Sequence, residues 1–292
     1  MMMDTAERTT SKERCAAATP AADFTIDQHW PAYATDEHAR WDRLFADAWA
    51  TLQGRACEAF LDAVEQLELS QAGIPDMREL SDRLEPLTGW RVVPVAGLVP
   101  DEVFFEHLAN RRFPAGAFIR SEAEMEYLEE PDIFHDIFGH VPLLATPEYA
   151  AFMQAYGKGG RRARQRGQLH NLARLYRYTI EFGLVREAEG LRLFGAGIMS
   201  STAESIFALE DPSPNRVQFE LERVMRTHYI IDDFQQTYFV IDSFEDLVAT
   251  CTEDFGDVYD SLRDLGDIEA HELREGDDVI HSGTMAYFDA KK

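Results

Sequence analysis

The sequence has no apolar run that approaches the roughly 20 residues of a membrane-spanning helix. Residues 1–22 carry mixed charges without an apolar core, which is typical of a disordered tail and not of a signal peptide. Only three cysteines occur, far apart and in neither a disulfide nor a metal-binding pattern. These absences predict a soluble, cytoplasmic protein without structural disulfides.

Positive charge is also scarce, because 28 Lys and Arg face 53 Asp and Glu, for a formal net charge of −25. Such a chain repels the phosphates of nucleic acids and of anionic membranes, so neither is expected as a partner. The one basic cluster, GGRRARQRGQ at residues 159–168, is interpreted as a solvated loop. The excess of acid suggests a salt-rich cytoplasm that screens self-repulsion.

Apolar residues spaced three and four apart dominate the chain, so the predicted fold class is mainly α, an α+β fold with a few short strands. The pattern predicts two helices over 36–69, broken near Gly54, and further helices over 77–89, 101–113, 170–187 and 214–228. Short strands are expected within 90–100, 113–121, 191–209 and 238–265, and helices follow in the last two stretches. Residues 266–292 are acidic and show no pattern.

Two histidines five residues apart stand in an apolar stretch, PDIFHDIFGHVPLL, at residues 131–144. A zinc protease would instead carry His-Glu-x-x-His, with its histidines four apart on one helical face. On an ideal α-helix His135 and His140 would lie about 140° apart, so both face one ion only if the helix ends or bends between them. Gly139 offers that break.

A third metal ligand must come from elsewhere, and Glu181 in RYTIEFGL is the best candidate because it stands in an apolar helical stretch. A buried, unpaired carboxylate is costly, and either a metal or an arginine partner would offset that cost. Two histidines and one carboxylate form the facial triad of non-haem iron(II) oxygenases, but zinc hydrolases use the same ligand types. The ligand types alone therefore leave iron and zinc both open.

Several long motifs in colinear order resemble the signature blocks of the pterin-dependent aromatic amino acid hydroxylases, and most closely those of the bacterial branch. These motifs are PDIFHDIFGHVPLL, RLYRYTIEFGL, FGAGIMSS, VPVAGLVPDEVFFEHLANRRFP, DQHWPAYATDEHARWDRLF and YIIDDFQQTYFVIDSFEDL. The resemblance covers roughly residues 24–265. It implies the catalytic fold of that family in a single domain over 23–265, followed by an acidic C-terminal extension over 266–292.

The resemblance also implies roles for individual residues. Iron(II) would be bound by His135, His140 and Glu181. A tetrahydropterin, either tetrahydrobiopterin or a bacterial tetrahydropterin, would be bound by Gly97, Leu98, Val99, Phe104, Asp136 and Tyr176. The amino acid would be bound by Arg120, which would clamp its carboxylate, and by Tyr127, Pro131, Phe182, Gly197, Ser200 and Ile231.

One position departs from the family pattern, because Arg177 stands where the family typically has an aromatic residue. Arg177 lies four residues before Glu181, on the same helical face, and could approach the metal pocket. It could pair with Glu181 and weaken iron binding, or reach a polar group of a different substrate. It could also turn its charge to a surface carboxylate and leave its stem as pocket wall, which is the interpretation favoured here.

The expected function is hydroxylation of a free aromatic amino acid, phenylalanine above all, with O2, iron(II) and tetrahydropterin. Two alternatives within the family are 5-hydroxylation of tryptophan and 3-hydroxylation of phenylalanine. A zinc hydrolase or an inactive metal-binding protein with the same three ligands remains an alternative from another class. The protein is expected to be a monomer, because no C-terminal heptad stretch is present, and to depend on pterin-recycling enzymes.

Overall fold

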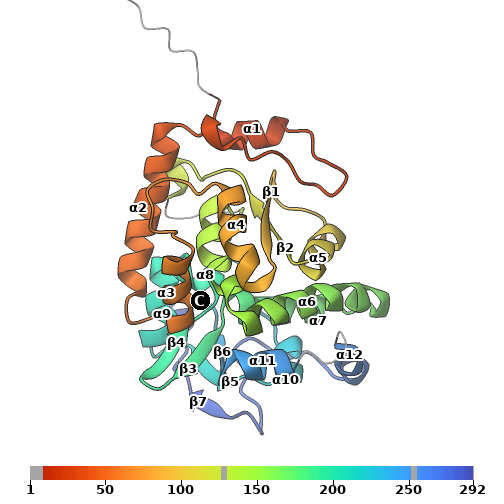
Figure 1. Ribbon diagram of the computed structural model, residues 1–292. Coiled ribbons are helices and arrows are strands. Elements are labelled where there is room, and N and C mark those ends of the chain that lie inside the picture. The colour runs from red at the N-terminus through yellow and green to blue at the C-terminus, as the bar shows by residue number, and fades with distance from the viewer. Residues whose placement is uncertain (1–8, 126–129, 251–254, 292) are drawn as a thin grey trace, which may run out of the picture.

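The computed structural model describes residues 9–125, 130–250 and 255–291. Helix α6 (Pro147–Arg166) crosses the middle of the molecule beside α7 (Leu169–Tyr176) and separates two groups of elements (Figure 1). Above it lie the N-terminal helices and a two-stranded sheet, and below it lies a five-stranded sheet. The predicted fold class, mainly α with a few short strands, is therefore confirmed.

The N-terminal helices form where apolar residues recur at helical spacing. Helix α2 (Thr35–Leu52) buries Trp41, Leu44, Ala48 and Leu52 along one face. The next two are α3 (Glu58–Gln66) and α4 (Met77–Thr88), which confirms the predicted break near Gly54. Helix α4 begins at the capping carboxylate of Asp76 and ends at Gly89, whose φ of +76° favours glycine.

Helix α5 (Asp101–Ala109) connects two parallel strands, β1 (Arg91–Val95) and β2 (Arg112–Gly116), and packs closely on α6. A Cβ atom at Gly157 of α6 would lie 2.4 Å from the backbone nitrogen of Ala109. A Cβ at Gly160 would lie 2.2 Å from the ring of Phe105. These two glycines therefore let the α5 backbone approach α6, which fixes the position of the residues on the opposite face of α5.

The five-stranded sheet has the order β4-β3-β6-β5-β7. Strands β3 (Leu184–Glu187) and β5 (Asn215–Gln218) run parallel to the central β6 (Thr237–Ile241), and every residue of β6 is buried. The edge strands β4 (Gly190–Leu193) and β7 (Val279–His281) run antiparallel to their neighbours. Helices that follow β4 along the chain are α8 (Ala196–Met199), α9 (Thr202–Glu210), α10 (Leu221–Arg226), α11 (Phe244–Ala249) and α12 (Gly256–Leu262).

Two turns of π-helix interrupt the regular structure, η3 (His135–His140) and η5 (Arg177–Glu181). In a π-helix the hydrogen bonds run from residue i to residue i+5, as in the 2.9 Å bond from the Phe182 N–H to the Arg177 carbonyl. The expectation that the helix breaks at Gly139 is wrong, because η3 continues through it. The described ranges also contain the short 3₁₀ turns η1 (Trp30–Ala32), η2 (Glu122–Glu124) and η4 (Pro142–Ala145).

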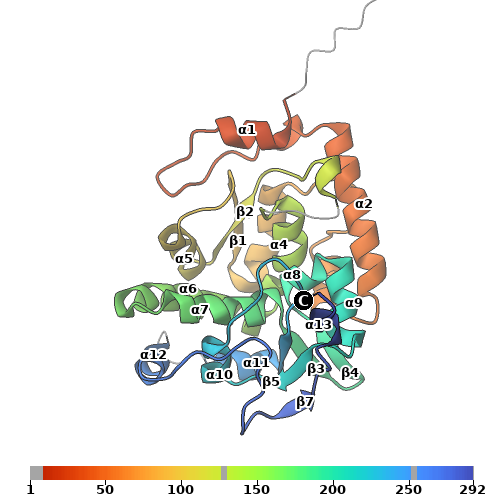
Figure 2. The ribbon, with the colours of Figure 1, turned by 180° about the vertical axis from the view of Figure 1, so that it is seen from behind.

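Parts of the two terminal stretches that the structure describes are more ordered than the sequence suggested, and residues 1–8 of the expected tail lie outside the described residues. The expectation of a disordered tail over 1–22 is wrong for helix α1 (Ser11–Ala17), which starts with a capping box between Thr10 and Glu13. In the C-terminal stretch, helix α13 (Ala286–Asp289) lies beside α9, where Tyr287 and Phe288 contact the ring of Phe207 (Figure 2). Local capping thus orders α1, and a few aromatic contacts order α13.

Two further expectations are corrected inside the chain. Residues 159–168, interpreted as a loop, belong mostly to α6, which ends at Gly167 in the left-handed conformation. The helix expected over 214–228 begins as strand β5, because the sequence NRVQ is buried in the sheet, and only α10 is helical. No helix in the described ranges is both long and apolar enough to cross a membrane.

Candidate active site

The two π-helical turns bring together the three residues expected to bind a metal. His135 and His140 stand at the two ends of η3, and Glu181 is the last residue of η5. Because a π-helix closes its hydrogen bonds over five residues, two side chains five apart project from the same side. This geometry replaces the helix break that α-helical periodicity required.

The potential ligand atoms of these residues converge on one point. The Nε2 atoms of His135 and His140 lie 3.2 Å apart, and they lie 3.7 and 3.4 Å from the carboxylate of Glu181. All three ligand atoms lie within 4.8 Å of one another. One face of such a cluster is protein, and the opposite face is left for other ligands, as in a facial triad.

A hydrogen-bond chain orients the first histidine. The hydroxyl of Ser200 donates to the carbonyl of Ala196 over 2.8 Å and lies 2.9 Å from Nδ1 of His135. With its proton committed to Ala196, the Ser200 oxygen accepts from the Nδ1–H of His135, so Nε2 carries the lone pair that a metal needs. The donor set therefore fits a divalent metal ion.

Helix α8 holds both π-helical turns in place. A Cβ at Gly139 would lie 3.0 Å from the carbonyl oxygen and from the Cβ of Ala196, so η3 packs directly on α8. A Cβ at Gly197 would lie 2.9 Å from a carboxylate oxygen of Glu181. The segment 196–200 therefore contacts His135 through Ser200 and Glu181 through Gly197, where a side chain would have no space.

Burial and charge tune the acid and base groups of the site. Burial by itself raises the pKa of Glu181, but attraction to His140 and then His135 outweighs it and lowers that pKa to about 2. Burial lowers the pKa of His135, so its ring is neutral near pH 7. Burial raises the pKa of Asp136 to about 7, although its carboxylate accepts a 2.7 Å hydrogen bond from the Gly116 N–H. An ionised carboxylate and a neutral imidazole are the forms that bind metals.

A cavity of about 320 Å³ opens beside the three candidate ligands. Six residues expected to contact a pterin line this cavity: Gly97, Leu98, Val99, Phe104, Asp136 and Tyr176. The ring of Phe104 lies 5.9 Å from the ring of Tyr176, which in turn lies 6.2 Å from His140. A flat bicyclic ligand would thus find aromatic side chains within stacking range of the metal cluster.

This architecture matches a known family. A family model described as "Biopterin-dependent aromatic amino acid hydroxylase" matches residues 5–258. The chain belongs to this family. It is 57% identical over 265 residues to a phenylalanine-4-hydroxylase of Caulobacter vibrioides, with 91% of this chain and 90% of the relative covered. A phenylalanine-4-hydroxylase of Ralstonia nicotianae is 52% identical over 262 residues, with coverage of 90% and 84%.

Solved structures of similar proteins carry iron and an aromatic amino acid. The iron- and phenylalanine-bound crystal structure of phenylalanine hydroxylase from Chromobacterium violaceum is 46% identical, with a TM-score of 0.86, and covers 92% of this chain and 99% of its own. A structure of the same enzyme with bound Fe(III) gives a TM-score of 0.88 at 47% identity, with coverage of 92% and 98%. Iron and a pterin are accordingly the cofactors of this hydroxylase.

Arg120, the residue expected to clamp the substrate carboxylate, is buried in an ion pair beside the metal cluster. Its Nε and Nη2 atoms donate to the two carboxylate oxygens of Asp132, over 2.8 and 2.9 Å. Asp132 also accepts from the backbone N–H of His135, over 3.1 Å. Arg120 does not line the cavity, so a ligand would reach it only from the side of its remaining N–H groups.

The other residues expected at the substrate lie in different places. Pro131 lines the cavity, whereas Phe182 and Gly197 lie against Arg177 and Glu181 respectively. Ile231 does not line the cavity, and its side chain is 78% exposed. Tyr127 lies outside the described residues.

Arg177 lines the cavity of this hydroxylase, where it contacts two aromatic rings. Its guanidinium carbon lies 5.4 Å from the ring centre of Phe182 and 5.1 Å from that of Tyr229. Among the described residues, its guanidinium forms no ion pair with a carboxylate. The interpretation that its charge turns away to a surface carboxylate is therefore wrong with respect to the described residues, because the guanidinium lies between two rings at the cavity.

Sequence reasoning missed two important residues of the site. Asp132 follows Pro131 in an apolar stretch, and an isolated acid in such a stretch is a recognisable sign of a buried ion pair. Tyr229 follows α10 in a stretch without periodicity, and no local signal indicates that it reaches the cavity.

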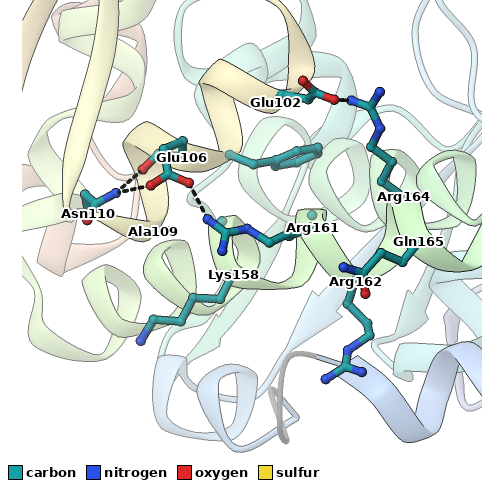
Figure 3. Close-up of a pocket in the computed structure, with 12 residues that line it drawn as sticks. Glu102, Glu106, Ala109, Asn110, Lys158, Arg161, Arg162, Arg164 and Gln165 are labelled. Carbon is teal, nitrogen blue, oxygen red and sulfur yellow. Dashed lines mark hydrogen bonds and ion pairs between the residues drawn. The ribbon is translucent and has the colours of Figure 1, made fainter. Parts of the chain in front are cut away.

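A larger groove, of about 850 Å³, lies between α5 and α6 but contains none of the candidate metal ligands. Figure 3 shows two ion pairs across it, from Arg161 to Glu106 and from Arg164 to Glu102. Its charges are therefore partly neutralised by each other. The smaller cavity, where the histidines and Glu181 meet, is the one with the features of an active site.

Proposed function

We propose that this chain hydroxylates L-phenylalanine to L-tyrosine, with O2 as oxidant, iron(II) as metal and a tetrahydropterin as electron donor. The observation that carries the proposal is the convergence of His135, His140 and Glu181 at a cavity with an aromatic wall. The phenylalanine-4-hydroxylases among the relatives, and the iron- and phenylalanine-bound structure at 46% identity, support the same reaction.

The metal would be held by the two histidines and Glu181. When bound, iron(II) and the tetrahydropterin supply the electrons that activate O2 for insertion of one oxygen atom into the ring. Ser200 keeps the Nε2 lone pair of His135 directed at the metal position, and the low pKa of Glu181 keeps its carboxylate ionised. Gly97, Leu98, Val99, Phe104, Asp136 and Tyr176 would hold the pterin.

The amino acid would be anchored at its carboxylate by Arg120. Asp132 holds the guanidinium in a fixed plane and leaves Nη1 without a hydrogen-bond partner among the described residues. Pro131 and Phe182 would border the ring, and apolar surroundings would keep water from the reacting atoms. A fixed carboxylate and a bordered ring hold one ring edge near the metal, which is the requirement for a regioselective reaction.

The wider context follows from the same chemistry. We assign residues 23–265 to the catalytic domain and the acidic stretch 266–292 to an extension of it. The enzyme would act as a cytoplasmic monomer in phenylalanine catabolism, and an enzyme that reduces the oxidised pterin would be required for repeated turnover.

Product analysis tests the proposal. The iron-loaded protein is incubated with tetrahydropterin, O2 and, in separate reactions, phenylalanine, tryptophan and tyrosine. We expect L-tyrosine from phenylalanine, and no product without iron or without pterin. In the matched variant Glu181→Ala, both iron content and tyrosine formation should be lost, because two histidines alone hold iron weakly.

Each contrary result has a distinct meaning. 3-Hydroxyphenylalanine or 5-hydroxytryptophan as the main product would replace the proposed reaction by one of the two alternatives within the family. Full iron content in Glu181→Ala would refute the assignment of the third ligand.

A further inference from the structure

Arg177 is a cation in the active-site cavity that the roles described above leave without a task. It lies one helical turn before Glu181 and lines the cavity together with Glu181 and Tyr229. Among the described residues that line this cavity it is the only lysine or arginine. A charged group here acts on whatever ligand enters.

Two aromatic rings hold the guanidinium from different parts of the chain. Phe182 follows η5 directly, and Tyr229 lies beyond α10, so the two rings are fixed by separate elements. Their centres lie 5.4 and 5.1 Å from the guanidinium carbon. Contact with a ring face uses the flat side of a guanidinium and leaves the N–H groups at its edge free to donate.

Nothing else in the described ranges occupies these donors. No hydrogen bond or ion pair of the Arg177 guanidinium occurs within residues 9–125, 130–250 and 255–291. The nearest acidic metal ligand, Glu181, is already within 3.4 Å of His140 and 3.7 Å of His135. Arg177 is therefore a held cation with unused donors at a binding cavity.

We propose that Arg177 is a specificity-determining residue that donates hydrogen bonds to an oxygen on the substrate ring. An unsubstituted ring beside the guanidinium removes water from its donors and replaces none of the lost hydrogen bonds, whereas a ring hydroxyl replaces them. The site then takes ring-hydroxylated aromatic amino acids in addition to phenylalanine, and it holds a hydroxylated product longer than the substrate. This inference rests on the proposed function, since it assumes that an aromatic amino acid enters this cavity.

Equilibrium binding tests the inference without turnover. Dissociation constants of the iron-loaded, full-length protein are measured by calorimetry for L-phenylalanine and for its 2-, 3- and 4-hydroxy derivatives. The selectivity for a derivative is the dissociation constant of phenylalanine divided by that of the derivative. For at least one derivative, we expect this selectivity to be about tenfold higher in the wild type than in Arg177→Met. The favoured isomer identifies the ring position that the guanidinium reaches.

Two further variants make the test specific. Tyr229→Leu removes one ring that holds the guanidinium, so it should reduce the same selectivity while the arginine remains, and it keeps the test open if Arg177→Met does not fold. Arg192→Met is the matched control, because Arg192 pairs with Glu187 and Glu189 and does not line the cavity. Its selectivity should equal that of the wild type.

Contrary outcomes separate this inference from the proposed function. Selectivity that changes less than about twofold in Arg177→Met, for all three derivatives, overturns the role of Arg177. So does an equal loss of affinity for all four amino acids, which would place the guanidinium at the common carboxylate. In both cases tyrosine formation from phenylalanine would leave the proposed function standing. Absence of both binding and tyrosine formation would overturn both.

Discussion

At the scale of single residues, three carboxyl groups in the interior respond to their surroundings in two ways. Glu181 faces two histidines, and its pKa is lowered to about 2. Burial raises the pKa of both Asp136 and Glu204 to about 7, although the carboxylate of Glu204 accepts a 2.8 Å hydrogen bond from the hydroxyl of Tyr238. The fold therefore keeps one carboxylate charged for a metal and keeps the other two partly protonated near neutral pH.

Glu204→Gln is expected to change how stability depends on pH. Because the pKa of Glu204 rises from 4.5 to about 7 on folding, its contribution is fully present below pH 4.5 and is lost as the pH rises through 7. Glutamine does not titrate, so the variant does not lose this contribution. Between pH 4.5 and 7 its free energy of unfolding should therefore rise, relative to that of the wild type, by on the order of 3 kcal/mol.

Urea unfolding at a series of pH values measures this difference. The difference in the free energy of unfolding between variant and wild type should be constant above about pH 8, because Glu204 is then ionised in both the folded and the unfolded wild type. A difference that does not depend on pH would show that Glu204 keeps an ordinary pKa in the folded protein.

The convergence of the candidate metal ligands could be predicted because their types are rare in apolar stretches and their motifs are long. His135, His140 and Glu181 stand out in this way. The choice of the ligand atom in each side chain depends on contacts between segments far apart in the sequence. The position of Arg177 between Phe182 and Tyr229 depends on such contacts as well. No local pattern encodes such contacts, so only the structure gives them.

At the scale of secondary-structure elements, the packing of η3 on α8 supports the metal cluster. Gly139→Val should lower the free energy of unfolding by about 1–3 kcal/mol, because its side chain has no space beside Ala196. It should also weaken metal binding, since η3 would move relative to Ser200. Gly266→Val is the matched control, because no atom lies within 4 Å of a Cβ at Gly266.

Chemical denaturation and metal titration measure both effects of Gly139→Val. A variant that binds iron as tightly as the wild type, despite lower stability, would show that η3 can shift on α8 without disturbing the ligands.

Helix α1 provides a second prediction at this scale. The backbone N–H of Ser11 donates to the buried carboxylate of Glu37 over 2.7 Å, and the hydroxyl of Ser11 accepts from the N–H of Ile119. Deletion of residues 1–18 should lower the melting temperature by about 4–8 °C, because it removes partners of buried polar groups. Differential scanning calorimetry measures the change, and Lys12→Ala, at an exposed pair with Glu124, should cost far less.

The elements that the sequence predicted correctly are those with a strong helical period, such as α2 and α4. Strand β5 was missed because its four residues lie directly before a true helix, and the period of that helix extended the prediction backwards. Helix α1 was missed because its composition is polar, although its capping box was a usable signal. A π-helical turn has almost the same residue pattern as an α-helical one, so it could not be predicted.

At the scale of the whole molecule, charge of one sign dominates. Local ion pairs such as those of Arg161 and Arg164 neutralise individual groups, but 53 acidic residues against 28 basic ones leave a large excess. Repulsion within this excess opposes the compact state, and salt screens it.

The melting temperature should therefore rise between low and molar KCl. The loss of exposed ion pairs acts in the opposite direction, but each is worth little in water. Thermal unfolding at increasing KCl concentration measures the balance, with a neutral osmolyte at matched osmolality as control. An unchanged or falling melting temperature would show that repulsion between the acidic groups is not a significant cost to this fold.

The π-helical turn between the two histidines also has a consequence for insertions and deletions. Its hydrogen-bond register accommodates one residue more than an α-helical turn does. Loss of a single residue between His135 and His140 would return this turn to α-helical register, in which two histidines four apart again share one face. Insertion of a residue offers no such register, so the candidate metal site should tolerate the loss of one residue here better than the gain of one.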